Sequence, residues 1–275
     1  MRLKRKCILI MAKDHTIHGV FMSFDLSAIE FSKKDMTRHV NLPRKMTADL
    51  AEFIGIMIGD GHLGLYIGKQ RSGTALKRSS VIISCNSEER GYCCHIAKLF
   101  YTLFNLKLSF EPDPRSKAVY LKAHSKAVVQ FLNLVLGIPI NRKTDTANIP
   151  QIIKNGQDEF KYAFLKGLAD TDFSVTFRKR PGKGHVYPRI KAAFKSRSLI
   201  DDLGEILKGV GFTYCKVYNE KVYRKGSEIP DLRHGLYLNG VSNFRAWCDT
   251  IGFSNPKFIK KVAKWNKEGV CPPGC

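Results

Sequence analysis

Acidic residues are scarce in this chain: its 275 residues include 24 Asp+Glu against 46 Lys+Arg, which gives a formal net charge of +22. The sequence also lacks the run of roughly 20 apolar residues that a membrane-spanning helix needs; its longest apolar stretches are Phe53–Ile58 and Phe131–Ile138. No secretory signal is recognised, because Lys13 interrupts the short apolar stretch after the basic start of the chain. These absences predict an intracellular protein without a membrane segment, in the cytoplasm, the nucleoid or an organelle.

The eight cysteines form no C-x-x-C pair, which argues against a zinc site and against a disulfide framework. Apart from the adjacent Cys93 and Cys94, the only close pair is Cys271 and Cys275. We therefore expect reduced thiols, as is usual inside cells. Whether Cys271 and Cys275 pair stays open.

The positive charge is spread through a sequence that is 44% hydrophobic and 11% aromatic, so the chain is expected to fold rather than to act as a basic tail. A folded scaffold rich in Lys and Arg is typical of proteins that bind polyanions, because neutralising phosphates releases counterions. Composition does not distinguish DNA from RNA.

An internal repeat organises most of the chain. An apolar helical segment begins with the expected N-cap Thr47 and ends at Gly59-Asp60-Gly61, and a second one runs over Asp158–Phe173. Each is followed by the same predicted order of elements, which gives two α-β-β-α-β-β-α units. The expected strands are 63–69, 79–85, 107–111, 118–123, 174–180, 186–194, 214–219 and 235–238, and the further helices are 88–104, 126–136, 199–210 and one from about 242.

The repeat predicts a division of the chain into five parts. Residues 1–44 are an N-terminal extension of unknown role, 45–137 the first unit, 138–156 a linker, 157–252 the second unit, and 253–275 a basic C-terminal helix and tail. The fold class is therefore α+β, with tandem pseudo-symmetric units. Strands such as Ser174–Arg178 alternate apolar and polar residues, so one face of each sheet is left free for a ligand.

The two segments that end the first helices, Phe53–Gly61 and Leu165–Phe173, resemble the paired LAGLIDADG motif of homing endonucleases, and the likeness covers residues 47–252. Gly55 and Gly59, like Gly167 and Thr171, are four residues apart and lie on one helix face. Small residues there allow two helices to pack closely. The resemblance implies that the two motif helices pair at a pseudo-two-fold axis, with two antiparallel sheets forming a saddle over DNA.

The same resemblance implies the site residues. Asp60 and Asp172, the last acids of the two motifs, would be the catalytic metal ligands, because two facing carboxylates suit Mg²⁺ or another hard divalent cation. Asp170, one motif position earlier, is taken as structural. The side chains beside the metals would be Asn86 and Lys195 after the second strands, and Lys122 and Asn239 near the ends of the fourth strands. A lysine there would position the attacking water or neutralise charge on the phosphate.

Basic residues on the polar positions and turns of the hairpins are expected to contact DNA, since a two-stranded ribbon fits the major groove. These candidates are Lys69, Arg71, Arg78, Arg178, Arg180, Lys183, Arg189 and Lys191.

The leading interpretation is a monomeric endonuclease that cuts a long, asymmetric site in double-stranded DNA. An RNA maturase that assists intron splicing, or a non-catalytic DNA-binding regulator, are the alternatives, and RNA stays a possible partner. Retention of both Asp60 and Asp172 favours cleavage. An intein is disfavoured, because the chain starts with Met1 and ends in Pro273-Gly274-Cys275 rather than with the His-Asn terminus of splicing chemistry.

Overall fold

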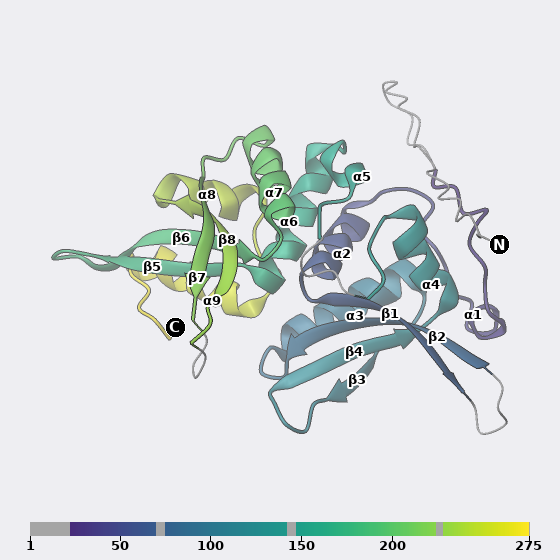
Figure 1. Ribbon diagram of the computed structural model, residues 1–275. Helices are drawn as coiled ribbons and strands as arrows, with labels where there is room; N and C mark the ends of the chain where they lie inside the picture. Colours follow the sequence, from purple (N-terminus) through teal and green to yellow (C-terminus); the bar gives the residue numbers. More distant parts are fainter. Residues whose placement is uncertain (1–22, 70–74, 142–146, 224–227, 275) are drawn as a thin grey trace.

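The two predicted units are both present, each built of a four-stranded antiparallel sheet with helices on one face (Figure 1). The computed structural model describes residues 23–69, 75–141, 147–223 and 228–274. The first unit consists of α2 (Ala48–Gly59), β1 (Gly61–Lys69), β2 (Ala75–Asn86), α3 (Arg90–Phe104), β3 (Ser109–Pro112), β4 (Ala118–His124), α4 (Lys126–Gln130) and the π-helix η1 (Phe131–Val135). The second consists of α6 (Asp158–Asp172), β5 (Ser174–Arg180), β6 (Gly184–Phe194), α7 (Arg197–Gly209), β7 (Cys215–Val222), β8 (Asp231–Asn239) and α8 (Val241–Thr250).

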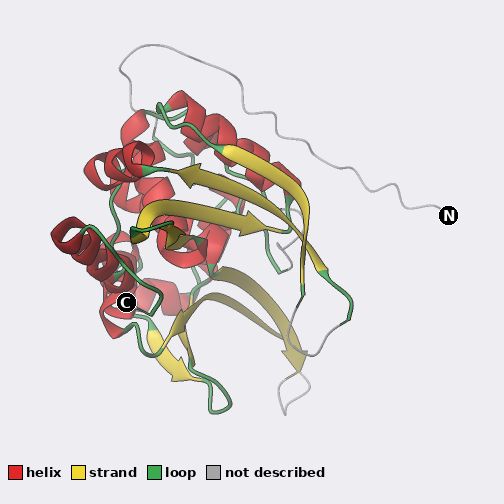
Figure 2. Ribbon diagram, turned by 90° about the vertical axis from the view of Figure 1, so that its left-hand side faces the viewer, coloured by secondary structure: helices red, strands yellow, loops and turns green. Residues whose placement is uncertain are grey.

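The two sheets have the same topology, with strand orders β1-β2-β4-β3 and β5-β6-β8-β7. In each sheet the apolar residues of alternate positions face the helices: Leu63, Val81 and Leu121 are buried in the first sheet, and Val175, Ile190 and Leu236 in the second. The helices lie along one side of the sheets (Figure 2). The opposite face of each sheet, called here the outer face, carries polar and charged side chains. This confirms the predicted fold class and the alternation on which it was based.

Helix α2 begins where the sequence predicts, because the Thr47 hydroxyl accepts a hydrogen bond from Leu50 N at 3.1 Å. Its residues Leu50–Ile58 are all buried. Helix α6 buries Phe164, Leu165 and the segment Gly167–Asp170 and lies against α2 in the middle of the molecule (Figure 1). The two units therefore share one core along this helix pair.

Three of the described helices lie outside the two units. α1 (Lys33–Thr37) belongs to the N-terminal extension, and α9 (Pro256–Glu268) forms the C-terminal helix. The segment 138–156, expected to be a plain linker, contains the short helix α5 (Gln151–Lys154). The helix expected over 126–136 changes from α to π geometry at Phe131. Cys271 is buried, and its expected possible partner Cys275 lies outside the described residues.

None of the described helices is long and apolar enough to cross a lipid bilayer.

Candidate metal site and nucleic-acid interface

The two motif helices pack through their glycines. A Cβ atom on Gly55 would overlap the backbone oxygen of Phe164 and lie 2.7 Å from Leu168 N. A Cβ atom on Gly167 would in turn overlap the backbone oxygen of Glu52. Since both neighbours are backbone atoms of the opposite helix, no rotamer change relieves either overlap. The helices lie this close only because both positions are glycine, as the sequence predicts.

This packing makes α2 and α6 end beside each other. Gly59 is the last residue of α2, and a Cβ atom there would lie 2.8 Å from Thr171 Cβ and would overlap the Asp172 carboxylate. Asp60 follows Gly59 directly and ends the helix. Phe173, which stands where the family motif ends in glycine, has φ −86° and is buried, so its side chain causes no backbone strain. The carboxylates of Asp60 and Asp172 thus come from two helix ends in direct contact.

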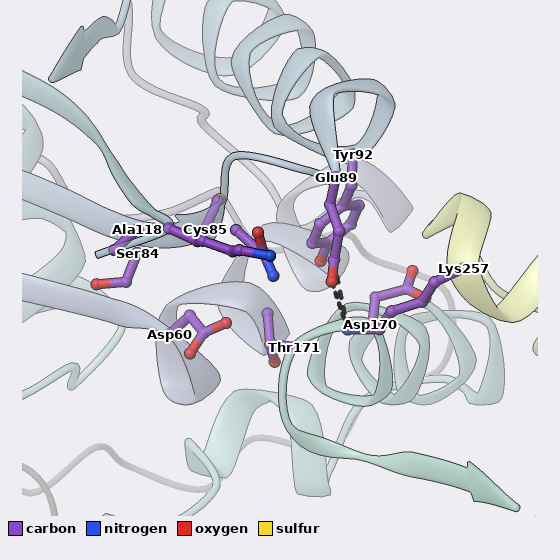
Figure 3. Close-up of a pocket in the computed structure, with 11 residues that line it drawn as sticks. Asp60, Ser84, Cys85, Glu89, Tyr92, Ala118, Asp170, Thr171 and Lys257 are labelled. Carbon is purple, nitrogen blue, oxygen red and sulfur yellow. Dashed lines mark hydrogen bonds and ion pairs between the residues drawn. The ribbon is translucent and has the colours of Figure 1, made fainter. Parts of the chain in front are cut away.

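A cavity of about 390 Å³ opens beside Asp60 (Figure 3). Glu89 and Tyr92 reach into it from the α3 side, Asp170 and Thr171 come from α6, and Lys257 comes from α9. The described residues that line it are Asp60, Ser84, Cys85, Asn86, Glu89, Tyr92, Lys117, Ala118, Asp170, Thr171 and Lys257. Asp172 is exposed and is not among the lining residues. Within the described residues, no group of three His, Cys, Asp or Glu side chains is arranged to hold a metal ion. Other protein oxygens and water would therefore complete any cation site here.

The segment before α9 closes one side of this cavity. Ser254 N donates to Asp170 Oδ2 at 2.7 Å, and Asn255 Nδ2 donates to Glu89 Oε2 at 2.6 Å and to the Asp170 backbone oxygen at 3.2 Å. Lys257 Nζ completes the set with an ion pair to Glu89 at 3.2 Å. Burial raises the pKa of Asp170 to about 7, in spite of the bonds from Ser254 and Asn255. The C-terminal segment therefore ties both units together next to the candidate site.

The sequence did not indicate this contribution. The side chains that close the cavity lie outside both motifs in the sequence, and their arrangement depends on where α9 packs. They are Glu89, Tyr92, Ser254 and Lys257. The one available signal was the basic, amphipathic pattern of residues 257–265, which predicts a helix but no position for it.

Glu52 is the buried charge at the α2–α6 contact. Its carboxylate pairs with His95 Nε2 and Lys166 Nζ, both at 2.7 Å, and accepts a bond from Ser254 Oγ at 3.1 Å. Burial acts to raise the pKa of Glu52, but the bonds to His95 and Lys166 outweigh burial and lower it. The folded state therefore favours the ionised carboxylate, which links α2, α3, α6 and the segment before α9.

We expect Glu52→Gln to destabilise the protein by about 1–3 kcal/mol at neutral pH. Breaking a buried ion pair costs about 3–5 kcal/mol, and we reduce this figure because His95 and Lys166 remain 33% and 28% exposed. Because the folded pKa lies below the ordinary value of 4.5, the stabilisation is present above that value and is lost as the pH falls through the folded pKa. Urea unfolding at neutral and acidic pH measures this difference in the free energy of unfolding, and Glu205→Gln, at an exposed position, is the control. If the difference in unfolding free energy between Glu52→Gln and wild type stayed constant on acidification, this account would be contradicted.

Strand register assigns equivalent positions in the two units. Two residues after Asp60, His62 pairs with Ile82 and Ile82 with Lys122. Two residues after Asp172, Ser174 pairs with Lys191 and Lys191 with Tyr237. Ile82 and Lys191 are therefore equivalent, and four residues further along their strands Asn86 and Lys195 are equivalent too, as the sequence predicts.

Asn86 lines the cavity, and its side-chain oxygen accepts a hydrogen bond from Glu88 N at 3.0 Å. Lys195 directly follows β6 and pairs with Asp231 at 3.3 Å.

The predicted equivalence of Lys122 and Asn239 is wrong. The register equates Lys122 with Tyr237, while Asn239 lies two residues further along and opposite Arg189. A shift of two residues keeps every side chain on the same face, so the apolar alternation that guided the comparison is unable to detect it. Both side chains still lie on the outer faces. Lys122 Nζ pairs with Glu111 at 3.3 Å, and the Asn239 backbone oxygen accepts a bond from Asn243 Nδ2 at 3.1 Å.

The candidate DNA-contacting residues follow the outer faces and the hairpin turn. Arg178, Thr176 and Ser174 stand opposite Tyr187, Arg189 and Lys191 on the outer face of the second sheet. Arg180 stacks on the Tyr187 ring at 4.3 Å, and Lys183 is exposed in the turn. Arg78 is exposed opposite Tyr66 in the first sheet. Lys69 is the last residue of β1, its side chain is not described, and Arg71 lies outside the described residues.

Lys191 and Arg189 form one cluster with Tyr237 and Glu220. Lys191 Nζ lies 3.0 Å from Glu220 Oε2, and the Tyr237 hydroxyl donates to the same carboxylate at 2.9 Å. Burial alone would lower the pKa of Lys191, but Tyr237 and Glu220 raise it, so the lysine stays charged. The Arg189 guanidinium lies 5.4 Å from the Tyr237 ring centre, and its Nε has no hydrogen-bond partner among the described residues. The outer face near Asp172 is therefore basic and pre-ordered.

Comparison with solved structures identifies this arrangement. A variant of I-SmaMI superposes with a TM-score of 0.53 at 11% identity, covering 82% of this chain and 90% of that one. I-DmoI in complex with DNA and Ca gives 0.51 at 17% identity, with 78% and 97% coverage, and the I-LtrWI LAGLIDADG homing endonuclease bound to target DNA gives 0.50 at 10% identity, with 81% and 90% coverage. The fold is that of the LAGLIDADG homing endonucleases. At these identities the likeness establishes the fold alone.

Sequence comparisons are weaker. No family model matches the chain. The replication factor C small subunit of Methanocaldococcus jannaschii is 26% identical over 220 residues, which are 80% of this chain and 10% of that protein. An A-type ATP synthase subunit of Pyrococcus abyssi is 30% identical over 135 residues, 49% of this chain and 12% of that protein. The chain thus spans about a tenth of the length of the curated proteins that it matches.

Proposed function

We propose that this protein is a site-specific endonuclease that hydrolyses both strands of duplex DNA with Mg²⁺ or another hard divalent cation. The observation that supports the proposal is the contact between the ends of α2 and α6, where the candidate catalytic residues Asp60 and Asp172 lie. Two adjacent carboxylates repel each other unless a cation lies between them. I-DmoI, which shares this fold, was solved with DNA and Ca, and this supports the assignment by analogy.

The donors at this position fit a hard cation. Carboxylate oxygens from Asp60 and Asp172, the side-chain amide of Asn86 and water are the oxygen ligands that Mg²⁺ prefers. Among the described lining residues Cys85 is the one thiol, and burial raises its pKa, so it stays protonated and does not compete as a soft ligand. When bound, such a cation supplies Lewis-acid stabilisation of charge on the phosphodiester and lowers the pKa of a bound water.

The remaining roles belong to the chain's own side chains. Asp60 and Asp172 would hold the cation at the contact between the ends of α2 and α6. Lys195 is held by Asp231 and Lys122 by Glu111, so each ammonium group is positioned where an incoming phosphate can replace the carboxylate partner. Asn86 and Lys195 occupy equivalent positions but differ in charge, so the two strands of the target are expected to be cut at different rates.

A randomised duplex library tests this proposal. Incubation with Mg²⁺ should produce cuts on both strands within one sequence family, and incubation with EDTA should produce none. Cleavage without sequence preference would contradict site specificity. No cleavage together with tight binding of structured RNA would favour the maturase alternative.

Two substitutions on one hairpin separate base contacts from phosphate contacts. Arg189 lies mid-strand on the outer face, so Arg189→Ala should relax the preference at one base pair by about 1–3 kcal/mol if it pairs bidentately with guanine. Lys183 lies exposed in the hairpin turn, so Lys183→Ala should weaken all duplexes similarly and lower the salt dependence of binding. Binding measured on a panel of single-base target variants checks both results, and a uniform change in both mutants would contradict direct readout by this strand.

A further inference from the structure

A second cavity, of about 1290 Å³, lies at the end of the first unit that is far from the candidate metal site. It is called here the distal cleft. Its lining comes from the N-terminal extension, from β1 and β2, and from α4 and η1. Figure 1 shows α1 near the distal ends of β1 and β2.

The charge of the distal cleft is strongly one-sided. Five of its residues are Lys or Arg and one, Glu30, is acidic; Glu30 is already paired with Lys126. Lys33, Lys34 and Arg78 are exposed and pair with no carboxylate among the described residues. Burial and then the charge of the neighbouring Lys122 lower the pKa of His124, and Arg78 adds a smaller effect in the same direction, against a backbone hydrogen bond with Ser79 and the charge of Glu111. The surface therefore attracts an anion.

The basic residues are held by a folded support. Asp35 in α1 is 1% exposed and accepts bonds from Ser32 N at 2.9 Å and from Ala127 N, the start of α4, at 3.3 Å. Glu30 N donates to Gln130 Oε1 at 2.8 Å. Ile29, Val40 and Leu42 of the extension are buried in the core. Lys33 and Lys34 thus project from a helix that is fixed to the first unit, which reduces the entropy lost on binding.

The distal cleft opens at the edge of the first sheet, where Leu65 and Ser79 belong to the helix-covered face and Arg78 and His124 to the outer face. Arg78 lines the cleft and stands opposite Tyr66, and His124 stands opposite Ser80 in the same sheet. A duplex lying along the outer faces would pass this rim. The undescribed residues 1–22 carry five Lys or Arg against one Asp, so their charge has the same sign as the cleft and disfavours them as its occupant.

We propose that the distal cleft binds the phosphate backbone of duplex DNA that flanks the target on the side of the first unit, with Lys33, Lys34 and Arg78 as its contacts. The inference rests on the proposed function in that the partner is DNA, but it requires no cleavage. The N-terminal extension is thereby assigned a role in lengthening the DNA footprint.

The test compares Lys33→Ala/Lys34→Ala with Lys98→Ala/Lys208→Ala, which removes the same charge from exposed lysines of α3 and α7. Binding to a long duplex of random sequence is measured in Ca²⁺ or EDTA over a range of salt concentrations, after thermal melts have confirmed that both variants fold. Two lost phosphate contacts should lower the slope of log affinity against log salt by about 2, so a fourfold rise in salt weakens wild type about tenfold more than the cleft variant. The control should keep the wild-type slope.

The inference would be overturned if the cleft variant and wild type had the same salt dependence of binding. It would also be overturned if the cleft and control variants lost the same amount of DNA affinity. If the cleft variant lost affinity for an RNA duplex but not for DNA, the assignment of DNA as the partner would be wrong. A protein that fails to cleave any DNA but shows the predicted difference in slope would refute the proposed function and leave the distal cleft in place.

Discussion

Asp60→Asn and Asp172→Asn are each expected to abolish DNA cleavage while leaving DNA binding intact. Both residues end a motif helix at the α2–α6 contact, and the amide that replaces the carboxylate keeps its size but loses the charge that a divalent cation requires. Loss of the cation's contribution of several kcal/mol corresponds to a fall in the single-turnover rate of about a thousandfold or more.

The matched control is Asp249→Asn, which removes one exposed carboxylate from α8, remote in sequence from both motifs. It should cut DNA like wild type. Binding without metal should be unchanged or tighter in the two motif variants, because a negative charge facing the phosphates has been removed. Cleavage by either motif variant at the wild-type rate would show that the carboxylate assignment is wrong.

Gly55→Leu is expected to prevent the two units from packing as they do. Even a single Cβ atom at Gly55 overlaps backbone atoms of α6, so Gly55→Ala should already cost about 1–3 kcal/mol, and leucine more. Chemical denaturation of both variants measures this cost.

Gly209→Ala is a suitable control, since Gly209 is also helical and no atom lies within 4 Å of its added Cβ. It should be neutral or stabilising by up to about 1 kcal/mol. Equal stability of Gly55→Leu and wild type would contradict the close contact between α2 and α6, and with it the arrangement of Asp60 and Asp172.

The sequence was sufficient for the repeat, the motif helices and the outer faces. Thr47 caps its helix, the glycine pairs produce one helix–helix contact, and period-two alternation orients the strands. These features depend on local chemistry and on residues close in the chain, so a pattern of a few residues is enough to predict them.

The features that were missed depend on tertiary contacts. The register that separates Asn239 from the position of Lys122 is set by the pairing of β6 with β8, and a two-residue shift leaves the apolar pattern unchanged. Ser254 reaches Asp170 across 84 positions of sequence, and Lys257 reaches Glu89 across 168. Neither pair has a spacing that a sequence motif would record.

The distal cleft illustrates the same limit. Lys33 and Lys34 are visible in the sequence as two of 46 basic residues, and nothing local distinguishes them from solvated surface lysines. Their proposed role depends on Asp35, whose buried carboxylate fixes α1 against α4. It also depends on Arg78, which lines the same cleft.

Crystals of the protein bound to its target and soaked with Mn²⁺ test the central claim most directly, because anomalous scattering locates the metal independently of activity. We expect an anomalous peak between the helix ends, at roughly 2.0–2.6 Å from carboxylate oxygens of Asp60 and Asp172, the range for oxygen ligands of hard divalent cations. A peak on the side of Asp170 and Glu89, with none at Asp60 and Asp172, would contradict the claim that the two motif carboxylates form the catalytic metal site.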